Sequence, residues 1–381
     1  MQYLFATLAA LLTVLLPAFN LYAEVITPPS PPSLLSSSYI LLDAGSGTIL
    51  AEKESHTRLP PASLTKIMTG YVTFNEIRGG RITLDDQVLI SSKAWKTEGS
   101  KMFIEVDKRV KLEDLIQGMV IQSGNDASVA IAEHVAGSET AFSSLMNQHA
   151  ERLGMKDSHF TNSTGLPDEA LYSSAYDMAI LARALINEFP EYYRWYSQKE
   201  FTYNKITQKN RNTLLANDES VDGVKTGYTE AAGYCLVTSA QRDGMRLVSV
   251  VMGTSSPRAR AQETQKLLNY GFRFYESHRL YDAKQSLKNV RVWKGATEQL
   301  AIGLENPLYV TLPRGDYENL QATLSIEAAL IAPIAVGQNV GKIRIELHGK
   351  LLQETPLIAL EEVAEGGFFS QITDHVLMLF N

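Results

Sequence analysis

A serine and a lysine stand three residues apart in the segment PPASLTKIMTGYV, and their chemistry raises the first question about this chain. Residues three apart on a helix share one face, so the amine of Lys66 can reach the hydroxyl of Ser63. A serine becomes a nucleophile when a base removes its proton, and a lysine is that base only when neutral. Burial and a second cation both lower a lysine pKa. The apolar neighbours predict burial, and therefore a nucleophile with its base.

This spacing alone is weak evidence, because a surface serine beside a solvated lysine gives the same pattern. Two further stretches add weight. The S-G-N sequence at 123–125 interrupts two helical patterns, where side chains can enter a cleft. The K-T-G sequence at 225–227 lies on a predicted strand, and a strand edge with a cation and a hydroxyl can dock a peptide that ends in a free carboxylate. Gly227 would let the backbones approach closely.

The elements that must hold these groups can be read from hydrophobic periodicity. A helix is expected from about Ser63 to Glu76 after two prolines, and Gly137 is expected to end another helix. Strands are expected near both ends of the part of the chain before about residue 278, so the sheet of this part must combine strands from both ends. Two strands are predicted in 38–53 and a hairpin in 233–253, and helices are predicted in 110–122, 126–137 and 259–276.

Composition limits the class of protein. The 381 residues are 45% hydrophobic and 20% charged, which is globular and sufficient for a large core. The formal charge of -7, with no Lys/Arg block, argues against a nucleic-acid partner. The single cysteine, Cys235, permits no intrachain disulfide and is predicted to be a buried structural thiol. We find no metal-ligand spacing and expect neither a metal nor a cofactor.

Domain organisation follows from shifts in pattern. Residues 1–23 resemble a signal peptide with a small residue at Ala23, although no Lys or Arg precedes the apolar run and an uncleaved anchor helix is the alternative. We expect a catalytic domain at 24–277 and a β-rich domain at 278–365. The expected location is therefore outside the cytoplasm.

The last segment, 366–381, is predicted to be an amphipathic helix with an apolar face. It is too short to span a bilayer, which needs about 20 apolar residues, but it could lie in a membrane interface. The alternatives are a terminal helix docked on the body and a dimer seam. The sequence leaves the oligomeric state open. The apolar face comprises Phe368, Phe369, Ile372, Val376, Leu379 and Phe380.

The ordered motifs S-x-x-K, S-x-N and K-T-G resemble those of the penicillin-recognising serine enzymes. Longer stretches, including GSKMFIEV, IQSGNDASVAIAEHVAGS, SSAYDMAILARALI and VDGVKTGYTEAAGYCLV, are similar to the type-5 group of low-molecular-mass penicillin-binding proteins. These are D-alanyl-D-alanine carboxypeptidases, and the resemblance covers nearly the whole chain. It implies an α/β (α+β) penicillin-binding-protein/β-lactamase-like transpeptidase fold with an antiparallel sheet flanked by helices, plus a small all-β C-terminal domain.

The resemblance also implies roles for the reactive groups. Ser63 matches the acylated nucleophile, and Lys66 matches its base. Ser123 matches the serine that helps to carry a proton to the departing amine. The oxyanion hole would be formed by the backbone N–H groups of Ser63 and Tyr228. The implied partners are a peptidoglycan stem peptide as substrate and a β-lactam as covalent inhibitor, and the implied location is the periplasmic face of an inner membrane.

The implied substrate-binding residues surround that centre. Arg211, in QKNRNTLL, would pair with the terminal carboxylate that Thr226 also binds. Asn125 would hold a substrate amide, and Lys225 would tune the electrostatics of Lys66. Tyr228 departs from the histidine often found there, which leaves the deacylation rate and side-chain preference open. The full set is Asn125, Arg211, Lys225, Thr226, Gly227 and Tyr228.

Three rival functions remain to be weighed. A β-lactamase of the same fold would need an acid to hold a hydrolytic water, and Arg183 stands where an E-x-x-L-N pattern would place it. A non-catalytic cell-wall binding protein would not need the intact reactive residues. A Ser-His-Asp hydrolase is disfavoured because no G-x-S-x-G surrounds Ser63.

Overall fold

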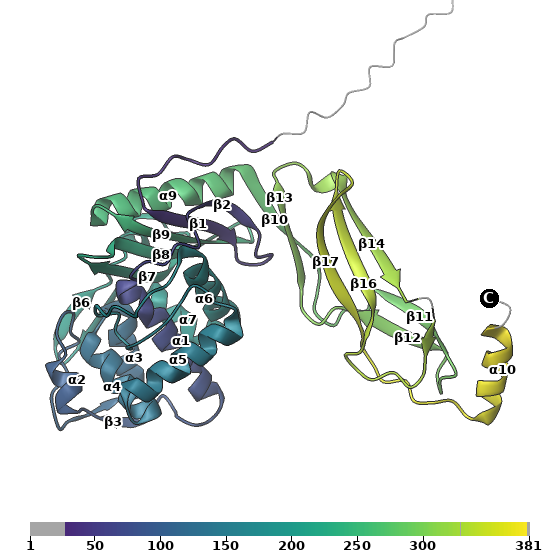
Figure 1. Cartoon of the computed structure of the whole chain (residues 1–381), viewed down its shortest axis with the longest axis horizontal. Helices are drawn as coiled ribbons and strands as arrows, with labels where there is room; N and C mark the ends of the chain where they lie inside the picture. Colours follow the sequence, from purple (N-terminus) through teal and green to yellow (C-terminus); the bar gives the residue numbers. More distant parts are fainter. Residues whose placement is uncertain (1–26, 328, 379–381) are drawn as a thin grey trace, which may run out of the picture.

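The computed structural model describes residues 27–327 and 329–378 and divides them into two domains joined by β10 (Figure 1). The expected signal peptide lies outside the described residues. The first domain is built on an antiparallel five-stranded sheet with the order β2-β1-β9-β8-β7. As predicted, the sheet combines strands from both ends of the first domain, because β1 pairs with β9. The strands are β1 (Ser38–Asp43), β2 (Ile49–Lys53), β7 (Val221–Thr229), β8 (Gly233–Arg242) and β9 (Met245–Thr254).

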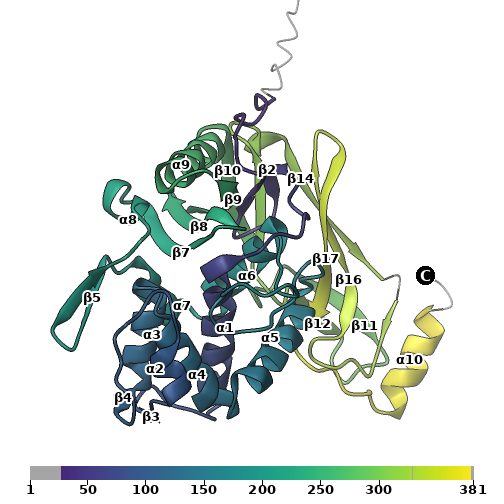
Figure 2. The same ribbon diagram turned by 60° about the vertical axis from the view of Figure 1, so that its left-hand side comes forward.

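Helices cover both faces of this sheet, as Figure 2 shows. The helix that carries Lys66 lies in the cluster on one face, and α9 covers the other. The long helices are α1 (Thr65–Arg78), α3 (Leu112–Ile121), α4 (Asn125–Ala136), α5 (Glu139–Leu153), α6 (Ala175–Glu188) and α9 (Pro257–Phe274). The short ones are η1 (Ala62–Leu64), α2 (Ser92–Lys96), α7 (Pro190–Tyr193), η2 (Arg194–Ser197) and α8 (Leu214–Asn217).

Neighbouring residues of β1 show how one sheet serves two cores. Successive side chains of a strand point to opposite faces. Ile40 and Leu42 therefore join the buried cluster that includes α1, α3 and α4, whereas Leu41 joins the cluster formed with α9. Each fully buried aliphatic side chain of this kind contributes about 1.5–3 kcal/mol. The sheet is thus held rigid from both sides, and β7 at its edge faces the reactive residues.

Local signals account for the ends of the helices. Gly137 ends α4 in the left-handed region at φ 75°, as predicted. Ser138 caps α5 and Ser256 caps α9, each accepting a backbone N–H three residues on. Two short strand pairs were not predicted, because their strands carry too few alternating apolar residues. They comprise β3 (Gln87–Leu89), β4 (Arg109–Lys111), β5 (Glu200–Tyr203) and β6 (Ile206–Lys209).

The second domain is the predicted small β-rich domain. Its six-stranded sheet has the order β14-β16-β17-β12-β11-β15, and β10 and β13 form a separate pair. β10 begins at Tyr275 and pairs along its length with β13, so this strand lies on both sides of the boundary expected at 278. The strands are β10 (Tyr275–Tyr281), β11 (Lys288–Trp293), β12 (Gln299–Gly303), β13 (Leu308–Pro313), β14 (Leu320–Ile326), β15 (Leu330–Ile331), β16 (Asn339–Leu347) and β17 (Lys350–Ala359), with η3 at Tyr317–Asn319.

Hydroxyl groups connect the two domains beside the β1–β2 turn. Ser46 Oγ lies 2.6 Å from Thr311 Oγ1, and Ser277 Oγ donates to Asp43 Oδ1 at 3.3 Å. Asp43 also accepts the backbone N–H of Ser46 at 2.7 Å. The turn that joins the first two strands therefore also holds the second domain.

The C-terminal helix α10 (Phe368–Met378) is docked on the second domain by one buried carboxylate. Asp374 accepts from Arg291 Nη2 at 3.2 Å and from the backbone N–H of Lys294 at 2.6 Å. The alternative of a helix docked on the body is therefore seen on its polar side. Leu379 and Phe380 of the expected apolar face lie outside the described residues.

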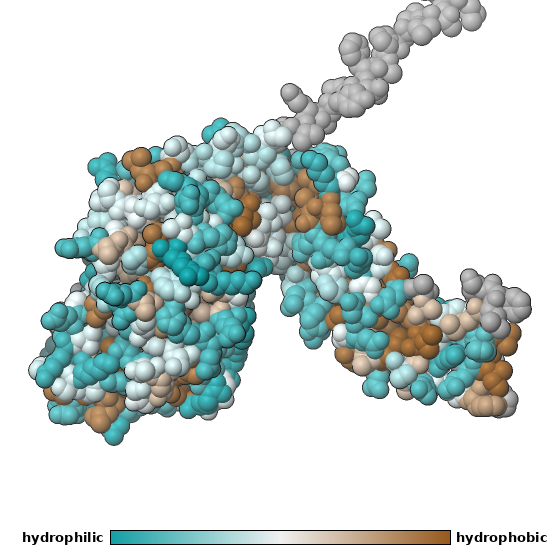
Figure 3. Space-filling view, in the orientation of Figure 1, coloured by the Kyte–Doolittle hydropathy of each residue, from teal (hydrophilic) through white to brown (hydrophobic). Residues whose placement is uncertain are grey.

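Apolar side chains of α10 face outward, away from this ion pair. Phe368 is 74% exposed, and Ile372 and Val376 are about half exposed. Figure 3 shows apolar surface over this helix at the far end of the second domain. None of the helices among residues 27–327 and 329–378 is long and apolar enough to span a bilayer.

Candidate active site

The expected nucleophile lies where a short 3-10 turn meets a helix. The predicted helix from Ser63 is divided into η1 and α1, and Ser63 occupies η1. Ala62 just before it has φ 49°, a conformation that residues with side chains rarely adopt and that often occurs at functional sites. This bend places the hydroxyl at the mouth of a cleft, one turn before the lysine.

Two glycines make the close packing around this bend feasible. A Cβ on Gly165, which has φ 82°, would lie 1.8 Å from the carbonyl oxygen of Ala62. A Cβ on Gly227 would lie 3.3 Å from the backbone nitrogen of Ser63. The absence of a side chain at each position lets the 154–174 loop and β7 approach the nucleophile from two sides. The close approach that K-T-G predicted is thus present.

Lys66 is the centre of the polar contacts. Its side chain is 1% exposed, and its Nζ lies 3.0 Å from Ser63 Oγ. Nζ also donates to Asn125 Oδ1 at 2.7 Å and to the carbonyl oxygen of Thr164 at 2.6 Å. The contact inferred from the S-x-x-K spacing is therefore present, together with two oxygens from distant parts of the chain.

These contacts dictate where a neutral amine holds its lone pair. The Asn125 amide is oriented by its own Nδ2, which donates to the carbonyl oxygen of Glu98 at 2.7 Å, so Oδ1 faces the lysine. A carbonyl oxygen accepts hydrogen bonds and cannot donate them. A neutral amine has two N–H bonds, which the oxygens of Asn125 and Thr164 accept. The lone pair then points at Ser63 Oγ, the geometry that a general base requires.

The electrostatics favour that neutral form. The pKa of Lys66 is lowered from 10.5 to about 7, chiefly by burial and then by the positive charge of Arg211, while Asp126 acts in the opposite direction. Burial also lowers the pKa of Lys225 well below its ordinary value, with repulsion from Lys66, Arg211 and Arg260 adding to the effect. The positive charge of Lys66 therefore disfavours the charged form of Lys225.

The S-G-N stretch forms the break between helices that its sequence predicted. α3 ends at Ile121 and α4 begins at Asn125, and Ser123 in the break has φ 69°. The next residue, Asp126, accepts the backbone N–H groups of Met102 and Phe103 at 2.9 Å each. This buried carboxylate holds the 99–104 segment over the cleft.

The cleft brings the expected residues together. It has a volume of about 610 Å³ and receives Thr226 and Gly227 from the edge strand β7, with Arg211 from the preceding loop. Lys225 is buried behind this edge, close enough to Lys66 for the lysine charge to lower the pKa of Lys225. Of the nine expected site residues, those that line the cleft are Ser63, Ser123, Asn125, Arg211, Thr226, Gly227 and Tyr228.

Two members of the site were missed by sequence reasoning. Arg260 on α9 lines the cleft, is 8% exposed, and donates to the carbonyl oxygen of Gly227 at 3.3 Å. Its sequence context, an arginine in an amphipathic helix, gave no functional signal. Thr164 contributes a backbone carbonyl, which has no signature in the sequence at all.

Tyr228 forms the outer wall of the cleft beside an aromatic partner. It is 51% exposed and stacks on Tyr234, with 4.2 Å between ring centroids. The Arg260 guanidinium lies 5.7 Å from the Tyr234 ring on the inner side. The position where the resemblance leads one to expect histidine therefore presents a broad phenol surface.

The structure also shows where the residues considered for other functions lie. Arg183 donates to the carbonyl oxygens of Ala44 and Gly45 at the domain junction, so it does not occupy a catalytic position in this cleft. Carboxylates are absent from the described residues that line the cleft. Cys235 is buried as predicted, and burial raises its pKa to about 11.

Comparison with known families agrees with this geometry. Residues 25–256 match the family model described as D-alanyl-D-alanine carboxypeptidase. Residues 275–365 match the model of the C-terminal domain of penicillin-binding protein 5. The D-alanyl-D-alanine carboxypeptidase DacC of Escherichia coli is 43% identical over 358 residues, which cover 92% of this chain and 90% of that relative.

Solved structures also resemble more than half of the chain. Penicillin-binding protein 5 from Haemophilus influenzae superposes with a TM-score of 0.83 at 39% identity, covering 88% of this chain and all of that one. Penicillin-binding protein D2 from Listeria monocytogenes, solved in its ampicillin-bound form, covers 63% of this chain at 27% identity with a TM-score of 0.59. The likeness to the first of these includes both domains.

Proposed function

The chain belongs to the D-alanyl-D-alanine carboxypeptidase family of serine hydrolases, and from that premise we propose that Ser63 is acylated by the peptide while Lys66 acts as its base. The substrate is a peptidoglycan stem pentapeptide, from which the terminal D-alanine is released. The observation that carries this assignment is the lone pair of Lys66, which its two other oxygen contacts direct at Ser63 Oγ.

In the acylation step, Ser63 Oγ attacks the carbonyl carbon of the last peptide bond as its proton moves to Lys66. The negative charge on the carbonyl oxygen is held by the backbone N–H groups of Ser63 and Tyr228. The C–N bond then breaks, and the departing amine takes a proton from Lys66 through Ser123. Water hydrolyses the ester in the reverse sense and restores Ser63. A β-lactam acylates the same oxygen, with its amine still tethered to the acyl group.

Recognition of the free carboxylate selects the end of the peptide. Arg211 and Thr226 line the same cleft, and Arg260 adds a further cation beside them. A charge-assisted hydrogen bond to a carboxylate is worth about twice a neutral one. The substrate therefore lies along β7 with its carboxylate at this cationic end and its earlier residues passing Tyr228.

We propose that hydrolysis of the penicilloyl ester is slow. A β-lactamase that uses a carboxylate to activate water would need an acid in the cleft, and the described lining residues include none. This distinguishes the proposed carboxypeptidase from the rival β-lactamase. A stable penicilloyl adduct detected by mass spectrometry for many minutes would support the distinction.

One experiment tests the main assignment. Purified protein is incubated with an N-acetylated pentapeptide ending in D-Ala-D-Ala, and released D-alanine is measured with and without penicillin. Release that penicillin abolishes, with the adduct mapped to Ser63, is the expected result. An adduct on another residue, or no D-alanine release, would overturn it.

We further propose that the protein is exported and lies on a membrane surface through α10. Asp374 orients the helix so that Phe368, Ile372 and Val376 face outward, which suits insertion into the interface of a bilayer. The segment 1–23 would direct export. A membrane-bound second domain would hold the catalytic domain away from the bilayer, toward the cell wall.

Vesicle flotation tests the membrane proposal. Neutral phosphatidylcholine vesicles should bind the protein, and the double variant Ile372→Glu/Val376→Glu should remain in solution. Leu351→Glu is the matched control, because Leu351 is similarly exposed on β17 at 49%. Equal flotation of the double variant and the wild type would contradict the proposal.

A further inference from the structure

The carbonyl oxygen of Thr164 directs the proposed base, so whatever holds this carbonyl affects catalysis. It accepts from Lys66 Nζ at 2.6 Å across 98 positions of sequence. Local contacts shape the turn: Asn162 Oδ1 accepts from the backbone N–H groups of Thr164 and Gly165 at 3.1 and 2.7 Å. These bonds stay within the loop and cannot fix its position relative to α1.

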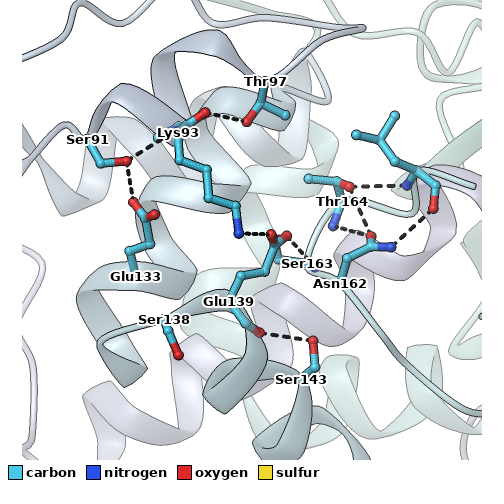
Figure 4. Close-up of polar contacts among 12 residues, drawn as sticks. Ser91, Lys93, Thr97, Glu133, Ser138, Glu139, Ser143, Asn162, Ser163 and Thr164 are labelled. Atoms are coloured by element: carbon cyan, nitrogen blue, oxygen red, sulfur yellow. Dashed lines mark hydrogen bonds and ion pairs between the residues drawn. The ribbon is translucent and has the colours of Figure 1, made fainter. Parts of the chain in front are cut away.

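A carboxylate from another helix supplies the missing anchor, as Figure 4 shows. Glu139 Oε1 accepts both the backbone N–H of Ser163, at 3.1 Å, and its hydroxyl, at 2.8 Å. On the opposite side, Thr69 Oγ1 donates to the carbonyl oxygen of Ser163 at 2.7 Å. Thr69 is one turn beyond Lys66 on α1, so Ser163 is fixed between the helix of the base and the first turn of α5.

Glu139 is itself fixed by a third element. Its Oε2 lies 2.7 Å from Nζ of Lys93 on α2, and its side chain is 13% exposed while that of Lys93 is 58% exposed. Burial would raise the pKa of Glu139, but the hydrogen bonds from Lys93 and Ser163 outweigh it and leave the pKa below the ordinary value of 4.5. A largely buried carboxylate is costly unless it is paired and hydrogen-bonded, and here all its partners belong to this one junction.

We propose that Glu139 is a positioning residue of the acylation reaction, which acts through Ser163 on the carbonyl of Thr164 and thereby directs the lone pair of Lys66 at Ser63. The inference rests on the proposed function, because it assigns a partner to the same base. Lys93 supports Glu139 from the surface. Neither side chain contacts the reacting atoms.

The test separates the chemical step from binding. Acylation by nitrocefin is followed by stopped flow in the full chain, which yields the rate constant at saturation and the dissociation constant of the preceding complex. For Glu139→Ala we expect the rate constant to fall about 10- to 100-fold, because a 1 Å displacement of a catalytic group can cost about 100-fold. The dissociation constant should stay within about twofold, because the carboxylate-binding side of the cleft is unaltered.

A conservative variant provides the rescue. In Glu139→Gln the amide oxygen can still accept from Ser163, whereas the ion pair with Lys93 is lost. Its acylation rate should return to within about threefold of wild type, although its melting temperature falls. If Glu139 served stability alone, the acylation rate would not recover in Glu139→Gln, which keeps the contact with Ser163 but loses the charge.

Glu133→Ala is the matched control. Glu133 accepts a hydrogen bond of 2.6 Å from Oγ of Ser91, the residue before α2. Among the described residues, no hydrogen bond joins Glu133 to the 163–164 segment. It should lower stability and leave the acylation rate unchanged. The proposal would be overturned if folded Glu139→Ala acylated at the wild-type rate, if the loss lay in the dissociation constant, or if Glu133→Ala lost as much. Failure of the wild type to acylate would instead refute the proposed function.

Discussion

The two domains differ in what their interiors contain. The second domain has a buried cluster made of Val, Leu, Ile and Ala only, drawn from both of its sheets. The first domain buries Lys66, Lys225 and Asp126 at 1 to 3% exposure. Its buried lysines have strongly lowered pKa values, whereas the aliphatic cluster has no group to titrate.

This contrast separates stability from chemistry within one chain. A buried charge without a well-paired partner costs free energy, so the first domain carries groups that a purely structural core would not contain. The large apolar clusters on both faces of its sheet provide the rigidity that holds such groups in place. Substitutions in the two regions should accordingly have opposite signatures, one on rate and the other on stability.

The largest effect is expected for Ser63→Ala. Loss of the nucleophile should reduce both penicillin acylation and D-alanine release about 10³-fold or more. The melting temperature should barely change, because the hydroxyl lies at the cleft mouth. Residual acylation above one per cent of wild type, measured by mass spectrometry, would show that another nucleophile contributes.

Lys66→Met should follow closely, with acylation reduced by about two to four orders of magnitude, the usual contribution of a general base. Met keeps most of the apolar stem and removes the buried amine, so the fold should be retained and unfolding should need at least as much denaturant. Circular dichroism with urea titration measures the second part. A variant that retained full D-alanine release would disprove the assignment of the base.

The pH dependence comes next in size. Because the pKa of Lys66 is lowered to about 7, the neutral amine predominates above that pH. The acylation rate constant should rise about tenfold per unit below pH 7 and level off above it. Stopped-flow measurements from pH 5.5 to 9 would show the midpoint, and a midpoint near 10 would mean that the lysine is not desolvated.

Arg211→Ala should have a smaller and more selective effect. Loss of the cation should reduce kcat/KM for the pentapeptide about 10- to 100-fold, since a charge-assisted bond to the free carboxylate is lost. A substrate whose terminal carboxylate is amidated serves as the control, because it should react equally poorly with both proteins. If the amidated peptide distinguished the two proteins, Arg211 would act on something other than the carboxylate.

The smallest effect on catalysis is expected in the second domain. Ile345 is fully buried in its aliphatic cluster, and Ile345→Ala should lower the free energy of unfolding of that domain by about 2–5 kcal/mol. The acylation rate of the folded protein should not change. A lowered rate at a temperature where the protein is fully folded would show that the two domains are coupled.

Much of this site could be predicted because its signals are local. Ser63 and Lys66 meet through helical spacing, and the hairpin of β8 and β9 follows from an Arg-Asp-Gly turn between apolar runs. The junction of α3 and α4 at 123–125 was visible as an interruption of periodicity. The predicted start of the nucleophile's helix was less accurate, because η1 replaces its first turn.

The rest depends on contacts that no pattern in the sequence encodes. The carbonyl of Thr164, the guanidinium of Arg260 and the carboxylate of Glu139 reach the site or its supports from distant segments. Every residue has a backbone carbonyl, so a functional one leaves no signal in the sequence. A single charged side chain on a helix usually faces water, so it is not expected to take part in a site. The sequence by itself determined which groups could react and their order. Only the tertiary structure decided how completely Lys66 is buried and that the lone pair of its neutral form faces Ser63, because both arise when separate segments close around one amine.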